Sequence, residues 1–155
     1  MSTGQGYSEC YPAVAESVPA ARAALSSFAA QAGAGGSRLD SIRLAASEAI
    51  TNAVMHAYAT EPARASAGAI HISASAVEDE LWILIADEGG GIRARADSKG
   101  LGLGLVLIAQ LTDDFQILNR GGGGTELRLR FKLTPGEGED GGQPRGSLSV
   151  ATSPA

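Results

Sequence analysis

The sequence has one cysteine, Cys10, among its 155 residues. An internal disulfide is therefore excluded, and the chain fits a reducing compartment. The first eleven residues lack the basic segment and apolar run of a secretory signal. The longest apolar stretch, Leu101 to Ala109, is too short to cross a bilayer. We therefore expect a cytoplasmic protein with no membrane association.

Positive charge is also scarce. The chain has 12 Lys and Arg against 17 Asp and Glu, a formal net charge of -5 and a pI of about 5.0. Because the cations are scattered along the chain, they form neither the electrostatic footprint of a nucleic-acid-binding protein nor a polybasic lipid-binding segment. The length predicts one domain, which can bury roughly 70% of its unfolded surface without disulfides or metals.

Several familiar catalytic patterns are absent. There is no H-E-x-x-H, and the two histidines lie on different predicted elements with no ligands to complete a zinc site. No phosphate loop G-x-x-x-x-G-K-[ST] exists, because Lys99 precedes its glycine. The glycines of 100–104 alternate, which excludes G-x-G-x-x-G, and no nucleophile elbow G-x-S-x-G is present.

The stretch Leu44 to Tyr58 is rich in alanine, lacks Gly and Pro, and repeats apolar residues at helical spacing. It predicts a helix that starts near residues 37–40. Glu48, Asn52 and His56 are four residues apart, so their side chains follow one strip beside the apolar face. Solvated polar side chains and a functional site explain this ladder about equally well when it is taken alone.

The remaining elements follow from periodicity and from turn residues. The last strand alternates cleanly, with Leu127, Leu129, Phe131 and Leu133 on its inner face. In chain order we expect an edge strand over 11–15, a helix capped by Ser17 and ending at Gly33, the central helix, strands over 70–77 and 81–86, a short helix within 101–111, and strands over 115–119 and 125–133.

This order predicts an α/β fold, a two-layer α/β sandwich with a mixed, mostly antiparallel sheet and helices on one face. Residues 1–10 are polar and glycine-bearing, and we expect them to be frayed. Residues 134–155 are rich in Gly, Pro and Ser with almost no large apolar side chain, which predicts a disordered tail. The domain itself covers 11–133.

Three further features are candidates for ligand binding. Asp87 ends a buried strand before a glycine-rich turn, where a carboxylate can accept a hydrogen bond from an exocyclic amine. The glycine-rich start of the helix at 100–105 offers unpaired N–H groups to an anion. Gly123-Gly124-Thr125 leads into the last strand. An ordinary turn, close helix packing and a hairpin turn are the respective alternatives.

Together and in this order, these features resemble the nucleotide-binding boxes of the GHKL (Bergerat-fold) ATPase superfamily. The run S-E-A-I-T-N-A-V-M-H-A-Y is most similar to the anti-sigma-factor serine/threonine kinases, histidine-kinase-like ATPase domains of bacteria. The resemblance spans about residues 11–133 and implies the Bergerat fold. The chain departs from the pattern in a weak, alanine-rich first strand and in a third consecutive glycine, Gly90.

The resemblance assigns roles to particular residues. It implies that Glu48 is the general base and that Asn52 binds Mg²⁺. His56 and Tyr58 also fit the family's helix pattern, and we interpret both as structural. The resemblance further implies contacts with ATP from two glycine boxes, from the adenine-recognising aspartate and from a supporting threonine. These residues are Asp87, Gly89, Gly91, Gly102, Gly104 and Thr125.

A short nucleotide lid would cover about 92–101. Arg93, Arg95 and Lys99 lie in it, where they either meet the phosphates or are simply solvated.

The implied activity is that of an ATP- and Mg²⁺-dependent protein serine/threonine kinase. It would phosphorylate an anti-anti-sigma factor, sequester a sigma factor and form a homodimer. The alternative is an ATP-binding regulatory module that switches partner binding without significant phosphotransfer. The catalytic part of a split histidine kinase is a third option, although no pair of dimerisation helices precedes the domain.

Overall fold

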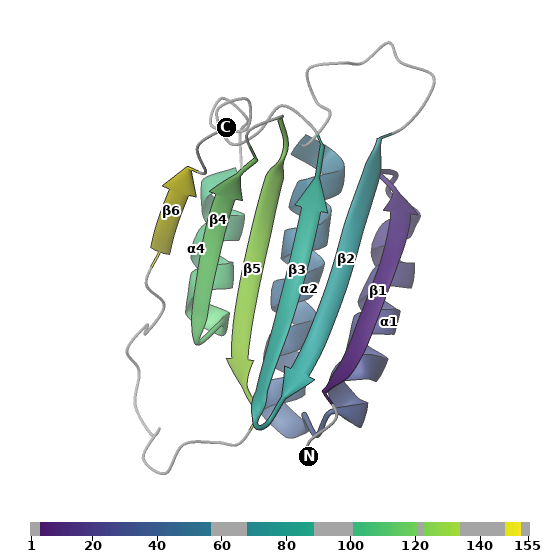
Figure 1. The fold of residues 1–155 in the computed structure, drawn as a ribbon, viewed down its shortest axis with the longest axis vertical. Coiled ribbons are helices and arrows are strands. Elements are labelled where there is room, and N and C mark those ends of the chain that lie inside the picture. The colour runs from purple at the N-terminus through teal and green to yellow at the C-terminus, as the bar shows by residue number, and fades with distance from the viewer. Residues whose placement is uncertain (1–3, 57–67, 89–100, 121–122, 134–147, 153–155) are drawn as a thin grey trace.

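The computed structural model describes residues 4–56, 68–88, 101–120, 123–133 and 148–152. Three helices, α1 (Ser17–Gln31), α2 (Gly36–His56) and α4 (Leu101–Leu111), lie on one face of a six-stranded sheet (Figure 1). The strands are β1 (Gln5–Pro12), β2 (Ala69–Val77), β3 (Glu80–Asp87), β4 (Asp114–Asn119), β5 (Thr125–Lys132) and β6 (Leu148–Thr152). This two-layer arrangement confirms the predicted α/β sandwich.

The sheet order is β1-β2-β3-β5-β4-β6, and every neighbouring pair is antiparallel except β4 and β6. The mixed, mostly antiparallel sheet is therefore also confirmed. In the helix layer α2 is central, because it contacts α1 on one side and α4 on the other and packs on β3. Because α2 lies between two helices, side chains on its flanks can contact α1 or α4. The side chains of the ladder can therefore meet a neighbouring helix.

The core lies between the two layers. In β5 the inward residues Leu127, Leu129 and Phe131 are buried, as the alternation predicts, and they pair in register with buried residues of β3. Buried alanines fill the α2 side of the core, namely Ala45, Ala46, Ala49 and Ala53. These small side chains let α2 approach its neighbours closely.

Both chain ends differ from the prediction. Residues 5–10, which we expected to be frayed, form most of β1, so this edge strand begins six residues before the predicted start at 11. The tail, expected to be disordered, contributes β6, which pairs in parallel with β4. Residues 134–147 lie outside the described residues.

A smaller correction concerns the start of α1. The structure places Glu16 at the N-cap position, with no side-chain capping bond, and the hydroxyl of Ser17 donates to the carbonyl oxygen of Pro12 at 2.6 Å. Ser17 is therefore buried against the end of β1 instead of capping the helix.

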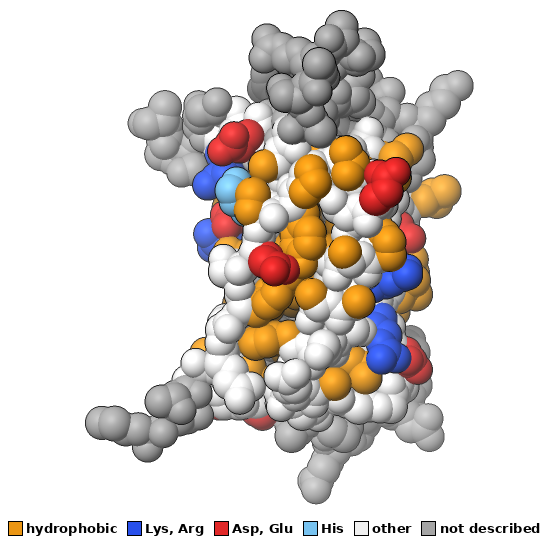
Figure 2. Space-filling view, turned by 90° about the vertical axis from the view of Figure 1, so that its right-hand side faces the viewer, with side chains coloured by type: hydrophobic (Ala, Val, Ile, Leu, Met, Phe, Trp, Pro, Cys, Tyr) orange, Lys and Arg blue, Asp and Glu red, His pale blue; other side chains and the backbone are white. Residues whose placement is uncertain are grey.

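Hydrophobic side chains join β1 to α1 along one side of the molecule (Figure 2). Tyr7 packs against Phe28 with ring centroids 6.1 Å apart, and the hydroxyls of Tyr7 and Tyr11 both donate to the Glu9 carboxylate. These hydrogen bonds lower the pKa of Glu9, with Tyr11 making the larger contribution. An edge strand with few apolar residues is thus fixed to the helix layer by its aromatic side chains.

Candidate active site

The ladder lies where α2 meets α4. Asn52 is buried, with 6% of its surface exposed, and Glu48 is half-buried one turn earlier. A Cβ atom placed on Gly104 would lie 2.9 Å from Nδ2 of Asn52 and 3.3 Å from Oε2 of Glu48. The structure thus brings together Glu48, Asn52 and Gly104, three of the residues singled out from the sequence. Only a residue without a side chain leaves both polar groups undisturbed.

The first turn of α4 adds an electrostatic feature to this contact. The helix has eleven residues, includes Gly102 and has no acidic residue in its first turn. Its first N–H groups lack helical partners, and the positive end of the macrodipole lies beside the ladder. This arrangement suits a polyphosphate, as the glycine-rich start predicted.

A second group of candidate residues lies where β3 ends and β5 begins. Asp87 and Thr125 are register partners and are 2% and 1% exposed. The Oγ1 atom of Thr125 is buried and has no hydrogen-bond partner in the described part of the chain. A buried hydroxyl without a partner is costly unless a ligand satisfies it.

Gly124 holds these two strand ends together, a role that the sequence did not reveal. Its φ is +98°, and a Cβ atom there would come within 2.1 Å of the carbonyl oxygen of Asp87. The sequence signal was the G-G-T run, which a hairpin turn explains equally well. The close approach shows that the turn also determines where Asp87 lies.

Both groups of residues are at the same end of the domain. Helix α2 and strand β3 run side by side, and their C-terminal ends meet at the upper edge of the molecule in Figure 1. One group offers a carboxylate and a hydroxyl from the sheet, and the other offers a carboxylate, an amide and helical N–H groups. A ligand with a polar ring at one end and phosphates at the other matches this distribution.

Several predicted site residues lie outside the described residues. They are Tyr58, Gly89 and Gly91 of the adenine box, and Arg93, Arg95 and Lys99 of the lid. His56 is the last residue of α2, four residues after Asn52. Their roles stay predictions.

Oxygen donors at the ladder fit a magnesium ion. The Asn52 side chain is buried, and its amide oxygen is the atom that would ligate the ion. Its Nδ2 has no hydrogen-bond partner among the described residues and could donate to a phosphate oxygen. No group of three or more His, Cys, Asp or Glu in the described ranges could hold a metal alone. A cation at Asn52 would therefore take most of its ligands from phosphates and water, as Mg²⁺ commonly does.

Comparison with known proteins agrees with this geometry. Residues 11–131 match the family model of the histidine kinase-like ATPase domain. Serine-protein kinase RsbW of Staphylococcus epidermidis is 32% identical over 138 residues, which are 79% of this chain and 85% of the relative. Anti-sigma F factor of Clostridium acetobutylicum is 28% identical over 124 residues, covering 73% of this chain and 83% of that protein.

A solved structure extends the comparison to three dimensions. The crystal structure of the RsbU and RsbW domains of a Mycobacterium tuberculosis protein superimposes with a TM-score of 0.65 at 28% identity. It covers 84% of this chain, which spans 33% of that longer protein. No helix among the described residues is long and apolar enough to cross a membrane. The chain belongs to the histidine kinase-like ATPase family, in the group that contains the anti-sigma-factor serine/threonine kinases.

Proposed function

We propose that this chain is an ATP-dependent anti-sigma factor that phosphorylates a serine or threonine of an anti-anti-sigma protein. The contact of Gly104 with both Glu48 and Asn52 carries this proposal. It brings an acid–base group, an amide and a helix N-terminus together in a family whose members include serine-protein kinases and anti-sigma factors. Positioning and charge stabilisation of this kind are what phosphoryl transfer requires.

At the sheet end of the site, Asp87 accepts a hydrogen bond from the exocyclic amine of adenine. Its burial and its register position beside Thr125 support this assignment, because a buried carboxylate discriminates strongly in favour of a ligand that donates to it. The Thr125 hydroxyl, which has no hydrogen-bond partner among the described residues, supplies a further polar contact near the base. We extend the ATP contacts to Gly89, Gly91 and Gly102 from the family pattern.

At the helix end, Glu48 accepts the proton of the acceptor hydroxyl as the hydroxyl oxygen bonds to the γ-phosphorus of ATP and ADP leaves. Glu48 is half-buried, so it is open to an incoming protein on one side. When bound through Asn52, Mg²⁺ neutralises phosphate charge. The N–H groups at the start of α4 stabilise the same charge.

The partners follow from the same proposal: an anti-anti-sigma protein as the substrate and a sigma factor as the sequestered protein, which places the protein in the cytoplasm. We also propose a homodimer. The sheet face opposite the helices supports it, because no described element covers that face and it carries the half-buried Trp82 and Leu84.

Replacement of Asn52 with alanine tests the metal assignment. Wild-type protein should bind ATP more tightly with Mg²⁺ than without it. Asn52→Ala should reduce that gain by at least about tenfold, since even outer-shell partners of metal ligands are worth about 10–100-fold in affinity. Calorimetric titration of ATP with and without Mg²⁺ measures both values.

Ser47→Ala, one residue from Glu48 on the same helix, is the matched control and should behave as wild type. Equal ATP affinities with and without Mg²⁺ in the wild type, or an undiminished gain in Asn52→Ala, would remove Asn52 as a metal ligand.

A further inference from the structure

An ion pair joins the ends of α2 and α4 that lie away from the ladder. Arg38, in the first turn of α2, donates from Nη1 to Oδ2 of Asp113 at 3.2 Å, and Asp113 is two residues after the end of α4. The two side chains are 22% and 19% exposed, so salt screens this pair less than a fully exposed pair. A cation in the first turn of a helix opposes the macrodipole, and the carboxylate of Asp113 offsets that effect.

The same carboxylate also binds strand β5. Oδ2 of Asp113 accepts the backbone N–H of Lys132 at 2.8 Å, and the N–H of Asp113 donates to the carbonyl oxygen of Arg130 at 3.0 Å. Lys132 is the last residue of β5, which ends at the lower edge of the molecule in Figure 1. One side chain therefore joins three elements at this edge: α2, the corner after α4, and β5.

The opposite ends of these three elements carry the candidate site. Asp113 lies at the start of α2, whereas Gly104 lies against Asn52 nearer the end of α2, so the two helices are antiparallel. Strand β5 begins at Thr125, whose hydroxyl belongs to the sheet end of the site. Because helices and strands are rigid along their axes, the bonds at their lower ends determine where their upper ends lie.

Helix α4 itself offers few directional contacts. Gln110 is the one residue among its eleven with a polar side chain, and Gln110 is exposed. The buried residues of α2 beside the ladder, Ala45, Ala49 and Ala53, form only shallow ridges. Apolar contact is not directional, so the packing of α4 on α2 restrains sliding only weakly. The hydrogen bonds of Asp113 are directional and fix the end of α4 at one point.

We infer that Asp113 is a positioning residue for phosphate transfer, which keeps α4 in place against the ladder through Arg38 and the Lys132 N–H. This inference rests on the proposed kinase function. The position of Gly104 has little tolerance, because a Cβ atom there would already lie 2.9 Å from Nδ2 of Asn52. A shift of α4 displaces its first N–H groups from the phosphates and from the proposed base. Misplacement by about 1 Å can lower a rate by about 10²-fold.

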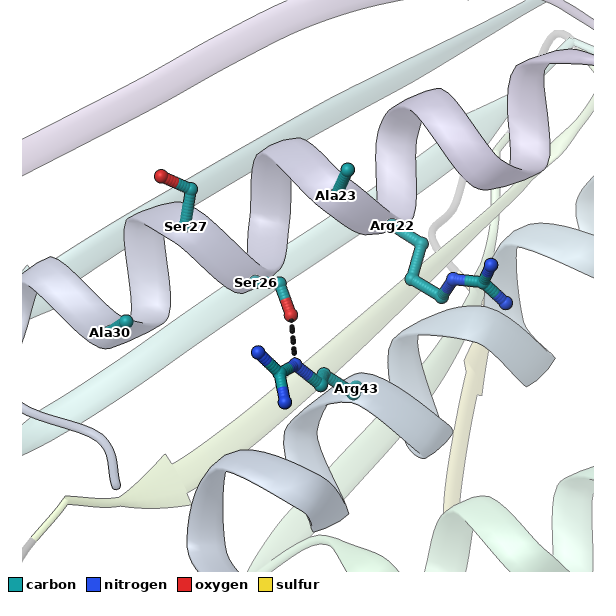
Figure 3. Close-up of a pocket in the computed structure, with 6 residues that line it drawn as sticks. All are labelled: Arg22, Ala23, Ser26, Ser27, Ala30 and Arg43. Carbon is teal, nitrogen blue, oxygen red and sulfur yellow. Dashed lines mark hydrogen bonds between the residues drawn. The ribbon is translucent and has the colours of Figure 1, made fainter. Parts of the chain in front are cut away.

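The other flank of α2 provides a matched control. There Arg43 donates from Nε to Oγ of Ser26 on α1 at 2.6 Å, in the groove between the two helices that Figure 3 shows. Arg43→Gln thus removes an arginine that joins α2 to a neighbouring helix. Helix α1 holds no proposed site residue, so this variant should transfer phosphate as wild type does.

Phosphate transfer by Arg38→Gln and by Asp113→Asn tests the inference. An asparagine keeps an oxygen for the Lys132 N–H and loses the charge that Arg38 binds. With ATP saturating, we expect kcat to fall about 10- to 100-fold in both variants, while the KM for the anti-anti-sigma protein stays near wild type. Combining the two substitutions should slow transfer no further, because both break one ion pair. Arg38→Lys, which keeps the charge, should recover part of the rate.

The amide signal of Gly104 in nuclear magnetic resonance spectra gives a readout that does not depend on turnover. Without ATP, this signal should shift in Arg38→Gln and Asp113→Asn and stay in place in Arg43→Gln. Spectra and kinetics are compared at a temperature at which thermal unfolding shows every variant to be folded. An unchanged Gly104 signal in Arg38→Gln, or a loss of transfer no larger than that of Arg43→Gln, would overturn the inference.

The two proposals fail differently. If wild-type protein transferred no phosphate, the kinase proposal would be wrong, and the Gly104 signal would still decide whether Asp113 fixes α4 against α2. If wild-type protein transferred phosphate and both variants kept its rate, the kinase proposal would stand and Asp113 would not position the site.

Discussion

Replacing Glu48 with alanine should lower phosphate transfer to the anti-anti-sigma protein by about 10²–10⁴-fold, the range that a general base contributes. ATP affinity should change little, because Glu48 lies beside Gly104 in the first turn of α4, and in the proposed mechanism its partner is the acceptor hydroxyl and not adenine. Single-turnover transfer measurements, with ATP affinity determined separately, report the two effects.

Glu48→Gln should be as slow as Glu48→Ala, since an amide keeps the shape of the side chain but cannot accept the proton at neutral pH. Ser47→Ala should be near wild type. If the alanine variant kept full transfer, Glu48 would not be the base.

The same variant separates a kinase from a nucleotide-controlled switch. A regulatory module that binds ATP and changes its affinity for partners has no proton to remove. Its partner binding should survive Glu48→Ala with little change, and wild-type protein should show negligible transfer. A kinase instead loses turnover and keeps binding. The half-buried position of Glu48 beside a helix N-terminus favours the kinase.

Substitution of Gly124 with alanine should have the largest effect on stability. The new Cβ atom would lie 2.1 Å from the carbonyl oxygen of Asp87, and the φ of +98° disfavours any side chain. We expect a loss of about 3 kcal/mol or more in the free energy of unfolding, because backbone strain of this kind costs about 1–3 kcal/mol before any clash. ATP affinity should fall as well, since Asp87 must move. Denaturant unfolding and ATP titration measure the two effects.

Gly33→Ala is the matched control. Gly33 has a φ of +109°, but a Cβ atom there meets nothing within 4 Å. This variant should lose about 1 kcal/mol through strain alone and keep its ATP affinity. Similar losses in both variants would show that the contact of Gly124 with Asp87 does not stabilise the site.

The interior of this fold was predicted well because buried residues recur in the sequence at the spacing of a helix or a strand. Strand β5 alternates and α2 repeats at helical spacing, so both were located to within a few residues. The sequences of β1 and β6 show no such spacing. β1 reads Q-G-Y-S-E-C-Y-P with six of its eight residues exposed, and only backbone pairing to β2 and two tyrosines define it. Composition cannot reveal pairing with a distant strand.

The candidate site was predicted in part for a similar reason. The spacing of Glu48 and Asn52 placed them on one strip, but only the packing of α2 against α4 shows that Gly104 faces both. The exposure of Leu103 and Val106 was not predicted either, because they belong to a continuous apolar run whose exposed and buried members look alike in sequence. The role of Gly124 likewise depends on a contact with Asp87, 37 positions earlier in the chain.

The most direct test of the central claim is phosphate transfer by the wild-type protein. The protein is incubated with ATP labelled at the γ-phosphate, Mg²⁺ and the purified unphosphorylated anti-anti-sigma protein, and the acceptor residue is identified by mass spectrometry. We predict that label appears on one serine or threonine of that protein in the presence of Mg²⁺ and is lost with Glu48→Ala. Tight ATP binding with no label on the anti-anti-sigma protein would contradict the account.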